Sequence, residues 1–430
     1  METFNLDLTQ PIGSGFSGLD SALAGGNALP ASYYLMLSDL SPELEGVHRV
    51  KEMAERINRL PFSDREAVRD IFTRLAREMV TLDATDIDVG GPACMEQVWY
   101  RVDGAKKPYP NMGRFTYSET DAILTTMLSP VQQQDLFKNL AFDFGYQLEV
   151  EGHDPRRYRA TVYFDNQWLA LGMRMLARKA YELKSLGFHP MIERGLMFRQ
   201  VRDGLTLVTG VTGSGKSTTL DAIVEANNQD VEAHILIIAQ PLEYIHTSKK
   251  CVIRHREVGT DVPSFVQGLV QGLRQDPDIV IVGEMRDKET ISTAMETADT
   301  GHKVFSTLHT GSATESIDRV VAEYPTDEQE RVRHRLADVL RCIVSQKLLP
   351  GIGGGRVLAK EVMWMTSSER AAIKNGNTNE IYQMMWEGAK YGKNTLEQDL
   401  FRLVRQGEIT PETAQSYANN KRRLMQLFEG

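Results

Sequence analysis

The stretch that most constrains this chain is residues 205–220, LTLVTGVTGSGKSTTL. Four β-prone residues lead into a glycine-rich turn that ends at Lys216 and Ser217, and a helix-compatible run follows. In such a turn, glycines let the backbone bend so that successive N–H groups, together with the positive end of the next helix, point at one phosphate. The spacing predicts a phosphate-binding loop between a strand and a helix. A glycine-rich turn without a ligand is the alternative.

Each position of the loop has a predicted role toward a nucleotide. Lys216 is expected to reach the β- and γ-phosphates as a point charge, Ser217 to give its hydroxyl to Mg²⁺, and Thr218 to lie beside the α-phosphate. Ser217 is thus the predicted metal ligand. The predicted nucleotide-binding residues are Gly210, Thr212, Gly213, Ser214, Gly215, Lys216, Ser217 and Thr218.

Length and composition limit the class of protein. A chain of 430 residues exceeds one ordinary core and favours two or three domains. Apolar residues make up 41% and charged residues 25%, a balance typical of soluble globular proteins. No apolar run approaches the roughly 20 residues that cross a bilayer, and residues 1–13 lack the features of a signal peptide, so we expect a cytoplasmic protein. The net charge of −9 argues against a surface devoted to nucleic acid.

The three cysteines are Cys94, Cys251 and Cys342, and none forms a C-x-x-C pair. The sequence therefore indicates neither a disulfide framework nor a zinc site. Each cysteine is expected to be a small buried side chain.

The first half of the chain divides into an N-terminal extension, 1–79, and a small mixed α/β domain, 80–187. Residues 1–40 are rich in Gly, Ser, Ala and Pro and predict a loosely ordered leader. Two helical stretches are expected within 44–79, packing on the next domain.

Within residues 80–187, helices are expected within 118–140. Strands are expected at 86–89, 97–102, 146–150 and 158–164, with a hairpin at Asp103-Gly104. Arg156, Arg157 and Arg159 form a basic cluster that composition alone explains as a solvated strand face.

Residues 188–365 alternate strand and helix, as a parallel sheet with crossover helices does, and 366–430 read as helical. Strands are expected at 205–209, 234–239, 279–282 and 304–308. The third of these strands is followed directly by Gly283 and Glu284. A carboxylate at the end of such a strand is expected to face the phosphates, where it polarises the attacking water or holds Mg²⁺ through one. A surface glutamate is the alternative. The fold class predicted for the whole chain is α/β.

Several blocks taken together resemble the secretion ATPase superfamily of type II and type IV secretion and type IV pili, and within it the PilT-type ATPases that retract type IV pili. The resemblance covers roughly residues 80–430. Besides the phosphate loop, it rests on LRQDPD at 273–278, GEMRD at 283–287, TGH at 300–302, TLHT at 307–310 and IDR at 317–319.

The resemblance implies a PAS-like N-terminal domain followed by a RecA-like ATPase domain, in a homo-hexamer that hydrolyses ATP with Mg²⁺. It also implies a cytoplasmic motor held at the inner membrane through a platform protein, as in twitching motility. Glu284 matches the Walker B glutamate that activates water. His302 and His309 match the histidine box near the γ-phosphate, against the alternative of satisfied core histidines. Arg159 and Arg174 resemble the arginines that the first domain extends toward the phosphates.

The chain departs from the family in two places. The acidic box, usually Glu-Asp-Pro-Ile-Glu, reads Ala239-Gln240-Pro241-Leu242-Glu243, so two carboxylates are missing and Glu243 is expected to compensate in part. Residues 368–373, SERAAI, also differ from the usual Ala-Ile-Arg-Asn-Leu-Ile. In the other direction, the missing cysteine pairs disfavour pilus extension and type II secretion motors, which commonly carry a four-cysteine zinc element.

Three functions follow from these features. The leading hypothesis is a motor for type IV pilus retraction, whose domains change their angle on hydrolysis. The runner-up is the motor of a conjugative or type IVB secretion system. The third is a weakly hydrolysing regulatory subunit that joins a ring with a paralogous ATPase, because Ala239 and Gln240 replace acids. No direct nucleic-acid partner is expected, since no aromatic and basic stretch indicates a strand-binding channel.

Overall fold

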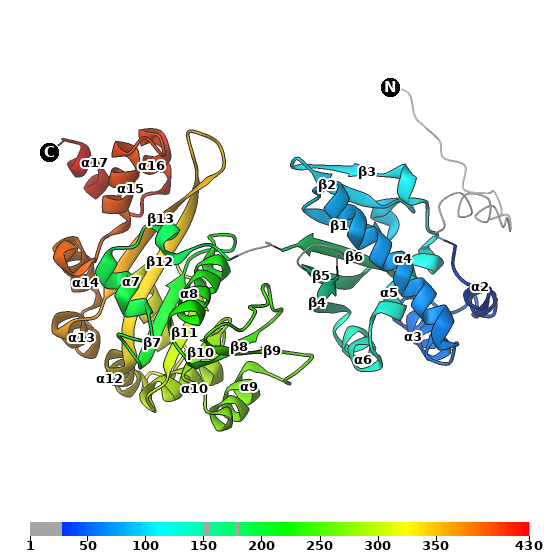
Figure 1. Cartoon of the computed structure of the whole chain (residues 1–430), viewed down its shortest axis with the longest axis horizontal. Coiled ribbons are helices and arrows are strands. Elements are labelled where there is room, and N and C mark those ends of the chain that lie inside the picture. Colours follow the sequence, from blue (N-terminus) through cyan, green and yellow to red (C-terminus); the bar gives the residue numbers. More distant parts are fainter. Residues whose placement is uncertain (1–27, 150–154, 177–179, 430) are drawn as a thin grey trace. The chain divides into compact units, whose positions relative to one another are not determined.

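The computed structural model describes residues 28–149, 155–176 and 180–429. The chain divides into two compact units, residues 1–178 and 179–430, and each is described by itself (Figure 1). Of the expected leader, residues 1–27 lie outside the described part. No helix of the described residues combines the length and apolar character that crossing a bilayer takes.

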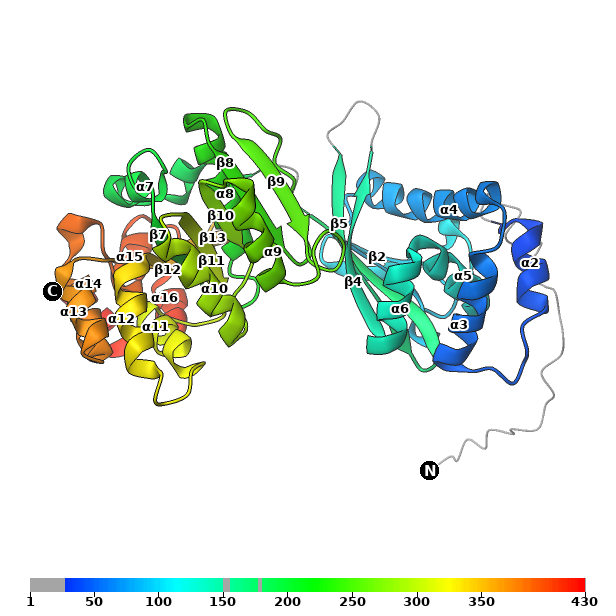
Figure 2. The same ribbon diagram turned by 90° about the horizontal axis from the view of Figure 1, so that it is seen from below.

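The first unit contains a six-stranded antiparallel sheet in the order β3-β2-β1-β6-β5-β4 (Figure 1). The helices of this unit lie beside the sheet (Figure 2). Asp103 and Gly104 connect β2 to β3 with positive φ angles of 50° and 79°, as a tight hairpin requires. The strands are β1 (Asp86–Gly90), β2 (Trp99–Val102), β3 (Ala105–Pro108), β4 (Ala141–Leu148), β5 (Arg156–Asp165) and β6 (Trp168–Met175), and the helices are α2 (Ala31–Ser38), α3 (Gly46–Ile57), α4 (Phe62–Thr81), α5 (Tyr117–Met127) and α6 (Pro130–Asn139).

One face of this sheet is covered by the helices of the same unit. Along β5, Tyr158, Ala160 and Val162 are buried in a core shared with α3, α4 and α5, because alternate residues of a strand share a face. The expected helices within 44–79 and 118–140 are confirmed. Our expectation of a loosely ordered segment up to residue 40 is corrected by α2, whose Tyr33 is buried and bonds the Thr126 hydroxyl at 2.9 Å.

The second unit contains a seven-stranded sheet in the order β13-β12-β7-β11-β10-β8-β9, parallel except for the antiparallel β12–β13 pair. The four strands that we expected are confirmed as β7, β8, β10 and β11. Three further strands, at 252–257, 340–350 and 356–364, were not predicted. The strands are β7 (Gly204–Thr209), β8 (His234–Ala239), β9 (Val252–Glu257), β10 (Ile279–Val282), β11 (Lys303–Leu308), β12 (Leu340–Pro350) and β13 (Arg356–Trp364).

Helices cover both faces of this sheet. Helices α7 and α8 pack on one face, and α9 to α14 pack on the other, while α15, α16 and α17 form a smaller core over β12 and β13 (Figure 1). The helices are α7 (Pro190–Leu196), α8 (Lys216–Asp230), α9 (Phe265–Gly272), α10 (Lys288–Asp299), α11 (Ala313–Ala322), α12 (Gln329–Val339), α13 (Ser367–Lys374), α14 (Thr378–Trp386), α15 (Leu396–Arg405), α16 (Pro411–Tyr417) and α17 (Lys421–Glu429). Leu183 and Phe188 belong to the core of this unit, so residues 180–187 pack with it rather than with the first unit.

Candidate nucleotide-binding and catalytic site

The loop between β7 and α8 is shaped by its glycines. Gly210, at the end of β7, has a φ of 148°, and a Cβ there would lie 2.4 Å from both the Gln346 backbone oxygen and Ser214 Oγ. Gly213 and Gly215 have φ angles of 80° and 88°. These left-handed angles and the close approach at Gly210 favour glycine at these positions.

The first turn of α8 is arranged to receive an anion. Gly215 is its N-cap, and no side chain caps the helix, so its first N–H groups are left for another acceptor. Ser214 Oγ is buried and has no hydrogen-bond partner among the described residues. Both features fit a phosphate group at this turn.

Lys216 is buried at the first position of α8. Its Nζ donates to the backbone oxygens of Gly210 at 2.8 Å and Val211 at 3.1 Å, which folds the side chain back over the loop. Burial lowers the pKa of Lys216, and the negative charges of Glu284 and Glu243 oppose that shift. The charges of both predicted carboxylates therefore act on the loop lysine.

A brace that the sequence did not suggest holds the loop from β12. Gln346 Nε2 donates to the Ser214 backbone oxygen at 2.8 Å, and Gln346 Oε1 accepts from the Thr219 hydroxyl at 3.0 Å. One buried amide thereby fixes both the loop and the first turn of α8 to the sheet. No local sequence signal marks Gln346, because its role depends on a strand that follows the loop by more than a hundred residues.

Glu284 follows β10 at the same edge of the sheet, since the carboxyl ends of parallel strands meet there. Its side chain is 12% exposed, with Oε2 at 3.5 Å from His309 Nε2 and Oε1 at 2.5 Å from Arg286 Nη2. Thr307 positions the turn, because its hydroxyl donates to the Gly283 backbone oxygen at 2.7 Å and its own backbone oxygen accepts from Met285 N.

His302 lies at the opposite edge. It precedes β11, and its backbone oxygen accepts from Gly204 N at the start of β7, while its Nδ1 lies 3.1 Å from the Thr297 backbone oxygen. A strand of six residues separates His302 from His309, a distance of roughly 20 Å at the usual strand rise. This corrects the expectation that both histidines approach the γ-phosphate: within one chain, only His309 lies at the edge that carries Lys216.

Arg159 and Arg174 lie in the first unit, opposite each other on β5 and β6. Arg174 is 68% exposed, and its Nε lies 2.8 Å from Asp86 Oδ1. Arg174 and the nearby Arg101 lower the pKa of Asp86 together with a hydrogen bond from Thr85, against the effect of burial. The two predicted arginines are thus brought together on one strand pair, whereas the basic cluster is divided, because Arg156 is buried.

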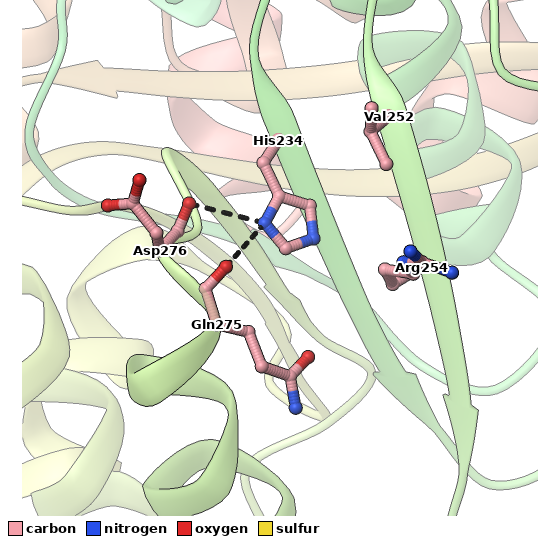
Figure 3. A pocket seen from close by; sticks show the side chains of 5 residues that line it. All are labelled: His234, Val252, Arg254, Gln275 and Asp276. Atoms are coloured by element: carbon pink, nitrogen blue, oxygen red, sulfur yellow. Dashed lines mark hydrogen bonds between the residues drawn. The ribbon is translucent and has the colours of Figure 1, made fainter.

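A separate cavity lies at the amino ends of β8 and β9. It has a volume of about 550 Å³ and is lined by His234, Val252, Arg254, Gln275 and Asp276 (Figure 3). The ring of His234 lies within hydrogen-bond distance of the Gln275 and Asp276 backbone oxygens, at 3.0 and 3.2 Å. Since the phosphate loop is at the carboxyl ends of the strands, this cavity is distinct from the nucleotide site.

Comparison with known proteins identifies the family. Residues 166–416 match the family described as type II/IV secretion system protein. The chain belongs to this family. The type IV pilus retraction ATPase PilT of Pseudomonas aeruginosa is 39% identical over 321 residues, which cover 74% of this chain and 90% of PilT.

Two further likenesses extend over most of the chain. The type IV pilus ATPase PilU of Pseudomonas aeruginosa is 31% identical over 359 residues, covering 82% of this chain and 91% of PilU. A crystal structure of the pilus retraction motor PilT with bound ADP matches with a TM-score of 0.73 at 37% identity, covering 82% of this chain and 98% of that one. The predicted α/β fold and the resemblance to the retraction ATPases are confirmed, and the chain is an ATPase of this family.

The site has the groups that phosphoryl transfer to water needs. The loop amides and Lys216 can bind phosphate charge, and Glu284 can polarise a water molecule. Proteins hold Mg²⁺ through one or two ligands together with phosphates and water, and the ion would neutralise charge on the phosphates when bound. Ser217, next to Lys216 in the first turn of α8, is the residue that would hold it.

Proposed function

We propose that this chain is the subunit of a homo-hexameric ATP-driven motor that powers type IV pilus retraction. The observation that carries the proposal is the likeness to PilT over 90% of that protein, in a chain whose loop lysine, Glu284 and His309 lie together at one edge of the sheet. A likeness of that extent includes both units, and a motor needs two bodies that change their angle during turnover.

In this proposal every predicted site residue except His302 has a task. The loop residues Gly210 to Thr218 bind the phosphates of ATP, and Ser217 also holds Mg²⁺. Glu284 activates water, His309 orients Glu284, and Glu243 supplies the remaining carboxylate of the acidic box. Arg159 and Arg174 are the arginines proposed to neutralise charge that develops on the phosphates, a task that suits guanidinium groups.

The motor works on the cytoplasmic side of the inner membrane, where a platform protein of the pilus machine holds it. A paralogous ATPase is a further partner, as PilU exists beside PilT in Pseudomonas aeruginosa. Light scattering on the purified protein with ADP tests the hexamer, since a monomer or dimer at micromolar concentration would contradict it.

The experiment that tests retraction is deletion of the gene followed by electron microscopy of pili and a twitching assay. We expect cells that keep their pili and lose twitching. Complementation with the natural gene restores motility, whereas complementation with Lys216→Ala does not, because that protein lacks the phosphate-binding charge. A deletion strain without pili contradicts the retraction proposal.

A second candidate is a weakly hydrolysing subunit that joins an active paralogue in one ring. The specific observation in its favour is the pair Ala239 and Gln240, which carry no carboxylate. Hydrolysis by the purified chain alone separates the two candidates.

A further inference from the structure

Glu243 lies in a segment that has neither helix nor strand. Residues 240–251 connect β8 to β9, and Glu243 is the only carboxylate of 239–243. It is near enough to Lys216 to oppose the lowering of the lysine pKa. Whatever fixes this segment therefore fixes the one carboxylate that remains in residues 239–243.

The segment is attached to α8, the helix that begins at Lys216. Part of the attachment is uncharged: Asn228 Nδ2 donates to the Thr247 backbone oxygen at 2.9 Å, and Asn228 Oδ1 accepts from Lys249 N at 2.9 Å. Lys250 N also donates to the Asn228 backbone oxygen at 3.0 Å. These bonds hold residues 247–250, the C-terminal part of the segment.

His246 makes the attachment nearer to Glu243. Its side chain is fully buried, with Nε2 at 3.2 Å from Asp221 Oδ1 and Nδ1 at 3.5 Å from Glu225 Oε2. Asp221 and Glu225 are four residues apart on α8, so they share one face of the helix. The ring therefore lies between two carboxylates of the helix that carries Lys216.

Further contacts enclose the ring of His246. Each of its nitrogens faces a carboxylate oxygen of α8. Tyr244 and His255 also pack against the ring, with centroids at 4.6 and 6.1 Å, and Lys249 pairs with Glu225. His255 Nε2 accepts from His246 N at 3.0 Å.

We propose that His246, held between Asp221 and Glu225, is the positioning residue that keeps Glu243 beside Lys216. Glu243 and His246 are three positions apart, which limits their separation to about 10 Å even in an extended chain. Fixing the ring on α8 therefore restricts where Glu243 lies relative to the first residue of that helix. The inference rests on the proposed role of Glu243 in hydrolysis.

The first test measures backbone hydrogen exchange in the full-length protein without nucleotide, so that it does not depend on turnover. In His246→Asn, amides of 243–250 are expected to exchange roughly tenfold to a hundredfold faster, since a hydrogen bond to a charged group is lost. Helix α12 is expected to exchange as before. The matched control is His334→Asn, because His334 is exposed on α12. Unchanged exchange in His246→Asn overturns the proposal.

The second test removes one carboxylate partner of the ring. In Asp221→Ala the contact to His246 Nε2 is lost, so amides of 243–250 are expected to exchange faster than in the natural protein and more slowly than in His246→Asn. Exchange equal to that of the natural protein would contradict a role for this contact.

The third test links the segment to the reaction. We expect His246→Asn to lower kcat roughly tenfold with little change in KM for ATP, because the phosphate loop is intact and outer positions of such sites typically contribute this much. Faster exchange with an unchanged kcat overturns the positioning role. A natural protein that hydrolyses no ATP counts against the proposed function, while the exchange measurements still decide how the segment is held.

Discussion

Glu284 Oε2 lies 3.5 Å from His309 Nε2, and the two side chains come from neighbouring strands that end at the same edge of the sheet. Thr307 fixes the turn that carries Glu284, because its hydroxyl and its backbone oxygen both form hydrogen bonds with that turn. The carboxylate is largely buried and the imidazole is half exposed. We therefore expect His309 to orient Glu284, while its own ring stays half exposed.

Replacement of His309 tests this relationship. In His309→Gln, the Glu284 carboxylate loses the rigid imidazole ring beside it and keeps only a flexible amide. We expect kcat to fall roughly tenfold to a hundredfold, as for other groups that orient a catalytic residue. ADP affinity, measured by titration calorimetry, is expected to stay the same because the loop is unaffected. His334→Gln serves as the control on α12. An unchanged kcat in His309→Gln would contradict the orienting role.

Two glycine substitutions separate steric from conformational demands in the loop. Gly210→Ala places a methyl group 2.4 Å from the Gln346 backbone oxygen, so we expect loss of ADP binding. A Cβ at Gly213 meets no atom within 4 Å, and only its positive φ is strained, at a cost of about 1–2 kcal/mol. Gly213→Ala is thus expected to weaken ADP binding less. Equal affinities for the two variants would contradict this account of the loop.

Removal of the brace from β12 is expected to loosen the loop without touching its phosphate-binding groups. Gln346→Ala leaves the Ser214 oxygen and the Thr219 hydroxyl without their buried partner, which is expected to destabilise the unit by about 1–3 kcal/mol. KM for ATP is expected to rise in the same variant. Gln406→Ala, at an exposed position after α15, is the control. Denaturant unfolding and steady-state kinetics check the two effects.

Lys303 gives the second unit a pH-dependent stability. Burial lowers its pKa to about 7, and its Nζ donates to the Gly195 and Val201 backbone oxygens. Between pH 7 and 10.5 the unfolded chain keeps a proton that the folded chain has released, so this lysine makes stability rise with pH across that window. Below pH 7 both states are protonated and the contribution is constant.

The variant Lys303→Met isolates this effect. It removes the buried amine and its two hydrogen bonds at every pH, but only the natural protein carries the titration. The free energy of unfolding of the natural protein minus that of the variant is expected to increase from pH 7 to 10, by at most about 1.4 kcal/mol per pH unit. A pH-independent difference in denaturant melts would show that Lys303 does not titrate in the folded state.

The part of the site that local sequence could predict is the part built from strand ends. Lys216, Glu284 and His309 each follow a short apolar strand, and parallel strands end at one edge, so their meeting follows from pattern alone. The same rule separates His302, which precedes β11, from His309, which follows it. The histidine-box motif alone groups the two residues at one site, whereas the length of the strand between them places them at opposite edges of the sheet.

Other features depend on contacts between segments that are far apart in the chain. Gln346 reaches the loop only because β12 pairs with β7, and β12 itself was not predicted because the apolar pattern of α12 continues into it without a turn signal. His246 is similar: its two carboxylates are on α8, and nothing in its own segment marks it. Such residues become visible only when the packing of helix, sheet and loop is known.

We infer that this site hydrolyses ATP without the two missing carboxylates of the acidic box. The most direct test is steady-state hydrolysis by the purified oligomer with Mg²⁺, beside Glu284→Gln and Lys216→Ala. We expect turnover in the natural protein, its loss in both variants, and retained ATP binding in Glu284→Gln only. Tight ATP binding without turnover in the natural protein would contradict the claim and favour a regulatory subunit.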